Sequence, residues 1–427
     1  MIQYLTWKHH YKPKNKGEIY YIFIVFKVLK LIYNKTLFII RQKYFKEKVL
    51  INYYELTKIL KQEKVFLYIE STTAMMIIEN VYNSFKKFYF NSVENIMPKY
   101  IKNNHYFPLL FKKKFKQITI PTLNKKELTK SETGDSFLQQ AISFIIDNDI
   151  SPPIINIPQR IKQKEIRYIK LIPLYNHIWF NLLITFKVDI KKEKMNNSSK
   201  TMAIDLGVNN FVTAVTSDNK SFIIDGRYLK SISHLYNKKL SIYNKNRKND
   251  KEKTKKIFLL TNKRNNRVKD YILKTARYII SYALKNDIRV IIIGYNKGLQ
   301  HHGLKENSSK FFKKAINQTL VQTPFLKFKE RLKYLCNYNN IEFKEINESF
   351  TSICSFYDNE DICYHKIYKG KRIKRGLFLT SDNKMVNADV NGALNILAKS
   401  KTNSDLEISH LRNSGILVPK RIFIYDI

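Results

Sequence analysis

The sequence predicts an α/β chain, and three observations support this prediction. Runs rich in β-branched and aromatic residues alternate with stretches that carry apolar residues at helical spacing. The segment 287–294 contains a continuous apolar run, which is typical of a strand buried on both faces. A polar linker at 191–200 separates two such parts, so the 427 residues are expected to form two or three domains.

The part before the linker is expected to combine a strand-rich module with a helical insertion. Residues 1–17 and 146–190 carry β-branched and aromatic runs with proline-marked turns, which indicate strands of one module. Residues 18–145 are mostly helical in pattern, most clearly at 71–90. We interpret the aromatic residues of that helix as core rather than as platforms for base stacking.

After the linker, the expected order is three strands, a helix, a strand, a helix, a strand and a helix. The strands are expected at 201–206, 211–216, 221–224, 287–294 and 342–347. This is the element order of the ribonuclease H fold, so residues 201–400 are predicted to form a domain of that class. Residues 401–427 are expected to form a polar and then basic tail.

Two aspartates stand out in the second part. Asp205 lies inside an apolar strand, where an ionised group is costly unless it binds something. Asp389 falls in the first turn of the last helix, with Asn387 as its expected N-cap, and the helix dipole favours a carboxylate there. Taken alone, Asp389 is better explained as a helix-start charge, but the upstream Asp205 favours a site that uses both.

The composition points to a polyanionic partner. The chain has 77 Lys and Arg residues against 35 Asp and Glu, a formal net charge of +42. Nucleic acid is the expected partner because counterion release drives such binding, and an anionic membrane surface is the weaker alternative. The apolar run 19–26 is too short to span a bilayer and no signal-peptide cleavage site follows it, which indicates a soluble protein.

The cysteines predict little chemistry. Cys336, Cys354 and Cys363 are too few for a disulfide scaffold and indicate a reducing environment. No CxxC pair is present, which excludes a four-cysteine zinc site. Cys354, Cys363 and His365 could bind a metal, but three unreactive side chains are the favoured interpretation.

Five segments of the second part resemble, in order, motifs of the TnpB family. They are IDLGVNN at 204–210, IGYNKG at 293–298, ESFTS at 348–352, YKGKRIKRGL at 368–377 and NADVNGA at 387–393. TnpB proteins are transposon-encoded, OrfB-type RNA-guided DNA endonucleases, related to Fanzor proteins and type V CRISPR effectors. Residues 33–37 and 41–42 resemble the N-terminal part of the family more loosely.

The resemblance implies a RuvC-type, ribonuclease H-like nuclease domain preceded by a wedge-like β-barrel (1–17 and 146–190) with a helical recognition insertion (18–145). It also implies a Mg²⁺-dependent endonuclease from an insertion sequence, with a guide RNA from the transposon end and double-stranded target DNA as partners. Such a protein would act at the nucleoid in the cytoplasm of a bacterium, or in the nucleus of a eukaryote.

The site implied by the resemblance departs from the family at one ligand. Phosphodiester cleavage with two Mg²⁺ ions needs several oxygen ligands. The usual family glutamate follows the fourth strand, where this chain has Gly294, and some relatives with this context carry it at the position of Glu348. Asp205, Glu348 and Asp389 are therefore the predicted catalytic residues and Mg²⁺ ligands.

In the alternative interpretation, Glu348 is a loop residue that caps the end of a strand and takes no part in catalysis. Two other glutamates, Glu342 and Glu345, lie nearby but are less well placed. A second departure is that the two CxxC pairs of many members are missing, and Glu360, Asp361 and the loop 370–376 stand in their place. No structural zinc is expected.

Basic residues at five positions are predicted to contact nucleic acid: Lys35, Arg41, Lys371, Arg372 and Arg375. Guanidinium groups suit phosphate oxygens. A solvated basic loop is an equally good explanation for Arg372 and Arg375.

Two other functions stay open. The missing glutamate at position 294 is compatible with a nuclease-inactive, RNA-guided DNA-binding regulator derived from the same family. A transposase that joins DNA strands itself is less well supported, because no tyrosine centre with paired histidines is evident, although His301 and His302 are adjacent.

Overall fold

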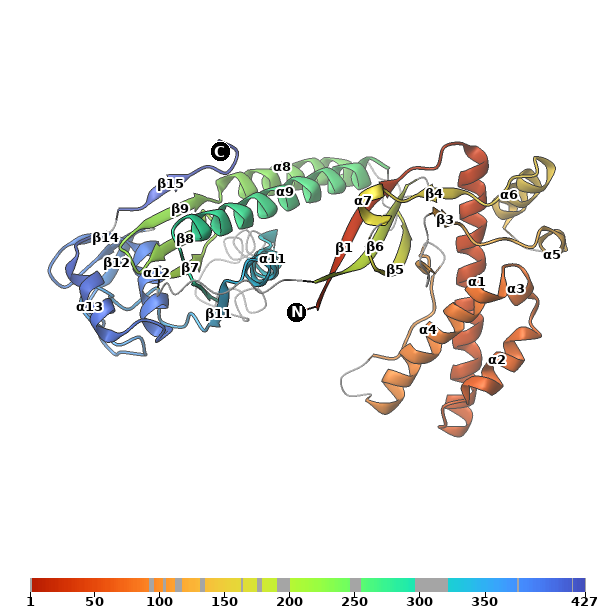
Figure 1. Cartoon of the computed structure of the whole chain (residues 1–427), viewed down its shortest axis with the longest axis horizontal. Coiled ribbons are helices and arrows are strands. Elements are labelled where there is room, and N and C mark those ends of the chain that lie inside the picture. The colour runs from red at the N-terminus through yellow and green to blue at the C-terminus, as the bar shows by residue number, and fades with distance from the viewer. Residues whose placement is uncertain are drawn as a thin grey trace. The chain divides into compact units, whose positions relative to one another are not determined.

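The computed structural model divides into two compact units, residues 1–190 and 191–427, and each is described by itself (Figure 1). The residues it describes are 2–91, 96–102, 105–111, 117–130, 135–162, 164–174, 179–189, 200–245, 255–295, 322–374, 376–416 and 418–426. Among them, no helix has the length and apolar character needed to cross a bilayer.

The first unit contains a four-stranded antiparallel sheet in the order β1-β6-β5-β2. Its strands are β1 (Ile2–Tyr11), β2 (Leu109–Phe111), β5 (Ile166–Pro173) and β6 (Phe180–Asp189). Two further strands, β3 (Gln117–Thr119) and β4 (Ile154–Asn156), form a separate pair. In the described residues β1 and β2 are the sheet edges.

The helices of this unit lie mainly between β1 and β2 in the sequence. They are α1 (Lys16–Glu47), α2 (Tyr53–Lys61), α3 (Lys64–Leu67), α4 (Ser71–Phe90), α5 (Lys125–Thr129), α6 (Ser136–Asp147) and α7 (Gln159–Lys162). The helix predicted at 71–90 is confirmed as α4. The apolar run 19–26 lies in α1, where Ile22 to Phe26 are buried, so it serves as core.

The second unit is built on a six-stranded mixed sheet in the order β11-β10-β7-β8-β9-β15. The strands are β7 (Thr201–Leu206), β8 (Asn210–Thr216), β9 (Ser221–Asp225), β10 (Val290–Gly294), β11 (Glu342–Ile346) and β15 (Lys420–Ile422). The first three are antiparallel, and β10 and β11 run parallel to β7. The predicted order of these five strands is thus confirmed.

Helices cover both faces of this sheet, and strand alternation decides which residues face which helices. Met202 and Ile204 belong to the core under α8 (Arg227–Lys245), α9 (Lys255–Lys285) and α11 (Phe325–Tyr338). Ala203 belongs to the opposite core, with α12 (Ala388–Lys399) and α13 (Asp405–Asn413). Because side chains alternate along a strand, Asp205 is on the α12 face with Ala203.

The segment 401–427, expected as a polar and then basic tail, contains a helix and a strand. Residues 405–413 form α13, and β15 pairs in parallel with β9 at the edge of the sheet. A three-residue strand is too short to show a period, which is why the pattern missed it. A small meander of β12 (Lys371–Lys374), β13 (Leu377–Leu379) and β14 (Met385–Asn387) also precedes α12.

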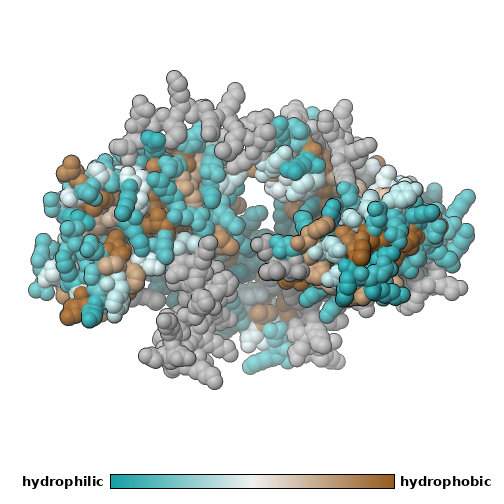
Figure 2. All heavy atoms as spheres, turned by 90° about the horizontal axis from the view of Figure 1, so that it is seen from below, coloured by the Kyte–Doolittle hydropathy of each residue, from teal (hydrophilic) through white to brown (hydrophobic). Residues whose placement is uncertain are grey.

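On the face in view, Figure 2 shows hydrophilic side chains over much of the described surface, with hydrophobic ones in scattered groups.

Candidate active site

Asp205 stands where β7 leaves the core. The four strand residues before it are buried, and Asp205 keeps a small accessible surface. The preceding residue, Ile204, pairs with Ile293 of β10, so Asp205 is level with Gly294 on the neighbouring strand. An added Cβ on Gly392 of α12 would lie 3.3 Å from Asp205 Oδ2, so the carboxylate lies directly against that helix.

Asp389 is held at the start of α12. The side chain of Asn387 accepts hydrogen bonds from the backbone N–H groups of Asp389 and Val390, at 3.0 and 3.1 Å, which confirms the predicted N-cap. Two donors contact the Asp389 carboxylate: Asn210 Nδ2 at 2.5 Å and Arg372 Nη2 at 3.2 Å. The residue is thus both a helix-start charge and a neighbour of Asp205.

Glu348 lies in a turn just after β11. The Thr351 N–H and hydroxyl donate to the Glu348 carbonyl at 3.2 and 2.8 Å, and Phe350 adopts φ 69°. A bulky residue rarely adopts this left-handed conformation, so tertiary contacts maintain the turn. Asn395 supplies one of them, because its Nδ2 donates to the Thr351 carbonyl at 2.9 Å.

Two buried asparagines on α12 attach the loop that carries Glu348. Asn391 Nδ2 and Asn395 Nδ2 both donate to the Cys354 carbonyl, at 2.8 and 2.7 Å, and the Phe356 N–H donates to Asn391 Oδ1 at 3.0 Å. The two asparagines lie one helical turn apart and are almost fully buried. Sequence reasoning missed both; the available signal was a polar pair at (i, i+4) spacing on an apolar helix.

Glu348 lies beside Gly294, the last residue of β10. Gly294 pairs with Ile346 on β11, and an added Cβ on Gly294 would lie 3.3 Å from Glu348 Cβ. The same Cβ would lie 2.5 Å from Cδ1 of the buried Ile396. Ile396 therefore occupies the space for a side chain at position 294, and Glu348 enters from the next strand.

The three carboxylates interact electrostatically. Burial, followed by the charges of Glu348 and Asp389, raises the pKa of Asp205 well above its ordinary value. Burial also raises the pKa of Glu348. Like charges at one site disfavour ionisation unless a cation neutralises them, so this arrangement favours cation binding.

The donor chemistry fits Mg²⁺, which prefers carboxylate oxygens. In the described part of the chain, however, no three His, Cys, Asp or Glu side chains are arranged closely enough to hold a single ion. Two ions about 3.5–4 Å apart would distribute the ligands over a wider site. The residues that could hold such ions are Asp205, Glu348 and Asp389.

We expect the metal-free protein to lose stability relative to the Asp205→Asn variant as pH rises. Folding favours protonated Asp205, because its pKa is raised above the ordinary value of 3.8. The relative stabilisation is therefore present below that value and lost as pH rises through the folded-state pKa. Denaturant unfolding in chelator from about pH 4 to pH 8 measures the difference between the two proteins. A pH-independent difference would contradict the assignment.

The other glutamates near the site have different roles. Glu345 pairs with Lys329 at 2.7 Å and with Lys333 at 3.6 Å, and Glu342 pairs with Lys344 at 3.6 Å. Each carboxylate thus has a lysine partner of its own. These contacts leave Glu348 as the glutamate next to Asp205.

The predicted basic residues divide into three groups. Arg372, on β12, contacts Asp389, and Lys371 beside it is exposed. Lys35 pairs with Glu63 at 2.9 Å, and Arg41 donates to the Pro98 carbonyl in the first unit. Their contact with nucleic acid stays a prediction.

Arg375, the remaining basic residue, lies outside the described residues, as do His301 and His302.

The segment that lacks the CxxC pairs is held by a buried carboxylate. Glu360 accepts hydrogen bonds from the backbone N–H groups of Ser355 at 2.7 Å and Lys369 at 2.8 Å. Cys354 is buried, whereas Cys363 is exposed with its Sγ 3.4 Å from His365 Nε2. Glu360 thus joins the two ends of this loop.

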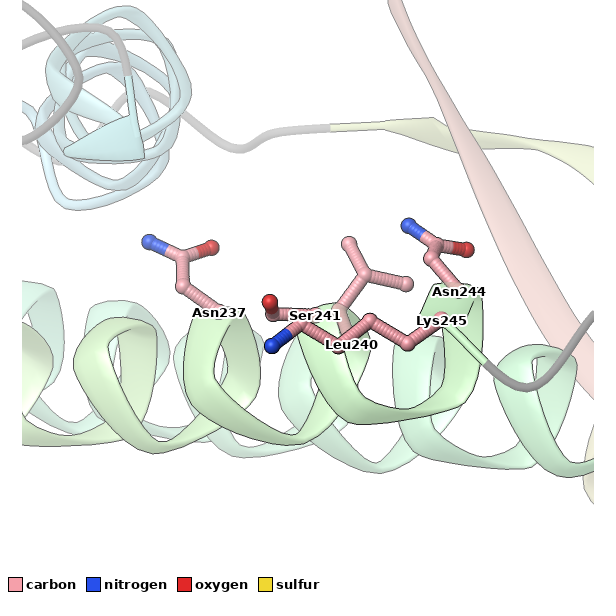
Figure 3. A pocket seen from close by; sticks show the side chains of 5 residues that line it. All are labelled: Asn237, Leu240, Ser241, Asn244 and Lys245. Atoms are coloured by element: carbon pink, nitrogen blue, oxygen red, sulfur yellow. The ribbon is translucent and has the colours of Figure 1, made fainter.

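The described residues that line a surface hollow elsewhere in the second unit include no carboxylate. Figure 3 shows its lining side chains on α8: Asn237, Leu240, Ser241, Asn244 and Lys245. Amides, a hydroxyl and an ammonium group offer hydrogen bonds but no ligand set for a divalent ion. The carboxylates remain the better candidate for a catalytic site.

Comparisons with known proteins match most of the second unit. Residues 185–300 match the family model OrfB_IS605, described as a probable transposase, and residues 325–396 match the Cas12f1-like TNB domain. No curated protein sequence matches the chain.

The fold is similar to that of a solved protein. The protein in the cryo-EM structure of the Cas12f1-sgRNA-target DNA complex has a TM-score of 0.52 and 15% identity, over 91% of this chain and 83% of that chain. A cryo-EM structure of a CRISPR-Cas12f ternary complex matches with a TM-score of 0.35 and 15% identity, over 91% and 82%.

The mixed α/β fold is shared with a Cas12f1 protein, and the two matched segments are similar to an OrfB-type probable transposase and to a Cas12f1-like TNB domain. These similarities support a TnpB-like family protein, as the motif series predicted.

Proposed function

We propose that the chain is an RNA-guided, Mg²⁺-dependent DNA endonuclease encoded by an insertion sequence. One observation carries this proposal: Asp205 and Asp389 share a site with Glu348, which takes the place next to Gly294. The match to a probable transposase and the fold shared with a Cas12f1 protein solved with guide RNA and target DNA support it.

In this proposal, Asp205, Glu348 and Asp389 hold Mg²⁺. When bound there, Mg²⁺ would supply a Lewis acid for the scissile phosphate and would lower the pKa of water. Asn210 and Arg372 hold the Asp389 carboxylate in place. The Arg372 side chain is 41% exposed, and its remaining donors are available to the phosphates of the cleaved strand.

The other parts of the chain provide for nucleic-acid binding. The strands and helices of the first unit would act as a wedge-like β-barrel module and a recognition domain for guide RNA and duplex DNA. The net charge of +42 supplies the electrostatic attraction, and base pairing with the guide supplies sequence specificity. We propose that the loop closed by Glu360 needs no structural zinc.

Cleavage of a guide-matched plasmid tests the proposal. The chain is expressed with its flanking transposon DNA, purified with its RNA, and mixed with matched or mismatched supercoiled plasmid. We expect linear product only with the matched plasmid and Mg²⁺, and none with chelator, because both guide pairing and the metal are required. Cleavage that persists after the RNA is removed would contradict guidance.

The second candidate function is a nuclease-inactive regulator that binds DNA through a guide RNA. Gly294 favours it, because the usual family glutamate is missing there. Guide-dependent binding of matched DNA, without cleavage in Mg²⁺ or Mn²⁺, would support this function over the nuclease.

A further inference from the structure

Arg421, in a segment that the sequence left without a role, is connected to the candidate active site. It lies on β15, opposite Ile223 of β9 at the sheet edge. Its Nη1 donates to Asp225 Oδ2 at 2.8 Å and to Asn210 Oδ1 at 3.0 Å. Asn210 in turn donates to Asp389. One asparagine therefore separates Arg421 from a predicted metal ligand.

Asp225 anchors the arginine. It is the last residue of β9 and only 4% of it is exposed. The backbone N–H and Nε of Arg227 donate to its carboxylate at 2.9 and 2.7 Å. Although burial opposes ionisation, Arg227 and Arg421 hold the pKa of Asp225 below its ordinary value. The carboxylate stays charged, so Arg421 has a fixed ionic partner.

The direction of the hydrogen bonds determines how Asn210 is oriented. Arginine only donates, so Arg421 must face the amide oxygen of Asn210. An ionised aspartate only accepts, so Asp389 must face the amide nitrogen. Arg421 and Asp389 therefore favour the same orientation of Asn210. Without Arg421 the amide oxygen loses its partner, and the side chain is held at one end only.

We propose that Arg421 is a positioning residue, which acts through Asn210 to orient the Asp389 carboxylate for metal binding. The inference rests on the proposed function in that Asp389 is taken to be a metal ligand. Mutation of residues that hold metal ligands in place typically lowers metal affinity or activity by about 10- to 100-fold. In this view, β15 completes the site as well as the sheet.

Metal binding tests the proposal directly. The whole chain, freed of nucleic acid, is titrated with Mn²⁺, and bound Mn²⁺ is measured by EPR. The Mn²⁺ that the wild type binds and the Asp205→Asn variant does not bind is counted as Mn²⁺ at the site. We expect Arg421→Met to weaken this binding by about 10-fold, because Asn210 is then held at one end only. Arg421→Lys, which keeps one donor, should recover part of the loss.

A matched variant controls for charge. Lys420→Met removes the same charge from the neighbouring residue of β15. It should bind Mn²⁺ like the wild type. Equal weakening in Lys420→Met, unchanged binding in Arg421→Met, or no site-specific Mn²⁺ in the wild type would overturn the proposal.

A second readout separates this proposal from the proposed function. With RNA-bound protein, Arg421→Met should raise the Mg²⁺ concentration for half-maximal cleavage by about 10-fold and leave guide-dependent DNA binding unchanged. If the wild type binds Mn²⁺ in an Arg421-dependent way but cuts no DNA, the nuclease function fails and the positioning role stands.

Discussion

Replacing Glu348 by glutamine is expected to slow cleavage of guide-matched DNA by about 1,000-fold, which corresponds to roughly 4 kcal/mol of lost transition-state stabilisation. Glutamine keeps the shape of the side chain but carries no charge, and a neutral amide is a poor ligand for Mg²⁺. Because the substitution changes no basic side chain, guide-dependent binding of DNA should not change. Initial cleavage rates and filter binding, measured on the same preparations, give the two quantities.

The control for Glu348→Gln is Glu345→Gln. Glu345 belongs to the lysine cluster of α11 and should be dispensable for cleavage. If Glu348→Gln cuts at the wild-type rate while Asp389→Asn does not, Glu348 is not a catalytic residue and the loop interpretation is correct.

The space around Gly294 allows a sharper form of this experiment. A glutamate introduced at 294 in the Glu348→Gln background meets Cδ1 of Ile396, 2.5 Å from the added Cβ. Changing Ile396 to valine removes that atom at a cost of about 1 kcal/mol in stability. We expect Gly294→Glu to restore cleavage in part only when Ile396→Val is also present.

Asp205→Asn is the second change with a large expected effect. The charges of both other carboxylates, Glu348 and Asp389, raise the pKa of Asp205. Its loss should reduce cleavage by about 1,000-fold or more. It should also abolish stabilisation by Mg²⁺, which for the wild type at 100 times the dissociation constant amounts to about 2.7 kcal/mol. Thermal unfolding with and without Mg²⁺ measures the second effect.

Asp218→Asn is a suitable control for Asp205→Asn. Asp218 pairs with Lys220 at 2.9 Å in the turn after β8. This turn follows Thr216, which pairs with Met202 at the opposite end of β7 from Asp205. That variant should keep both cleavage and the Mg²⁺ response. An Mg²⁺ response that persists in Asp205→Asn would show that the ion binds elsewhere.

Features that depend on neighbours in the sequence were predictable. The start of α12 is one, because Asn387 caps the helix through the N–H groups two and three residues later. Another is the central strand at β10, where a continuous apolar run requires burial on both faces. Asp205 was conspicuous for the same reason, as a charge in an apolar strand.

Features that depend on contacts between distant residues were not predictable from patterns. Asn391 and Asn395 attach the Glu348 loop to α12, and their sequence context shows only an apolar helix. The hydrogen bond from Arg41 to the Pro98 carbonyl is another such contact, and the predicted contact of Arg41 with nucleic acid stays a prediction. A basic side chain looks the same in sequence whether its partner is a phosphate or its own backbone.

The sequence by itself determined the α/β class, the order of five strands and the identity of Asp205 and Asp389 as unusual carboxylates, because periodicity, capping and the cost of burying charge are local. The motif series added Glu348. Only the tertiary structure decided that Glu348 lies beside Gly294, and that Arg421 reaches Asp389 through Asn210. Both depend on strand register and on hydrogen bonds across about 50 to 210 residues of chain, which no local pattern encodes.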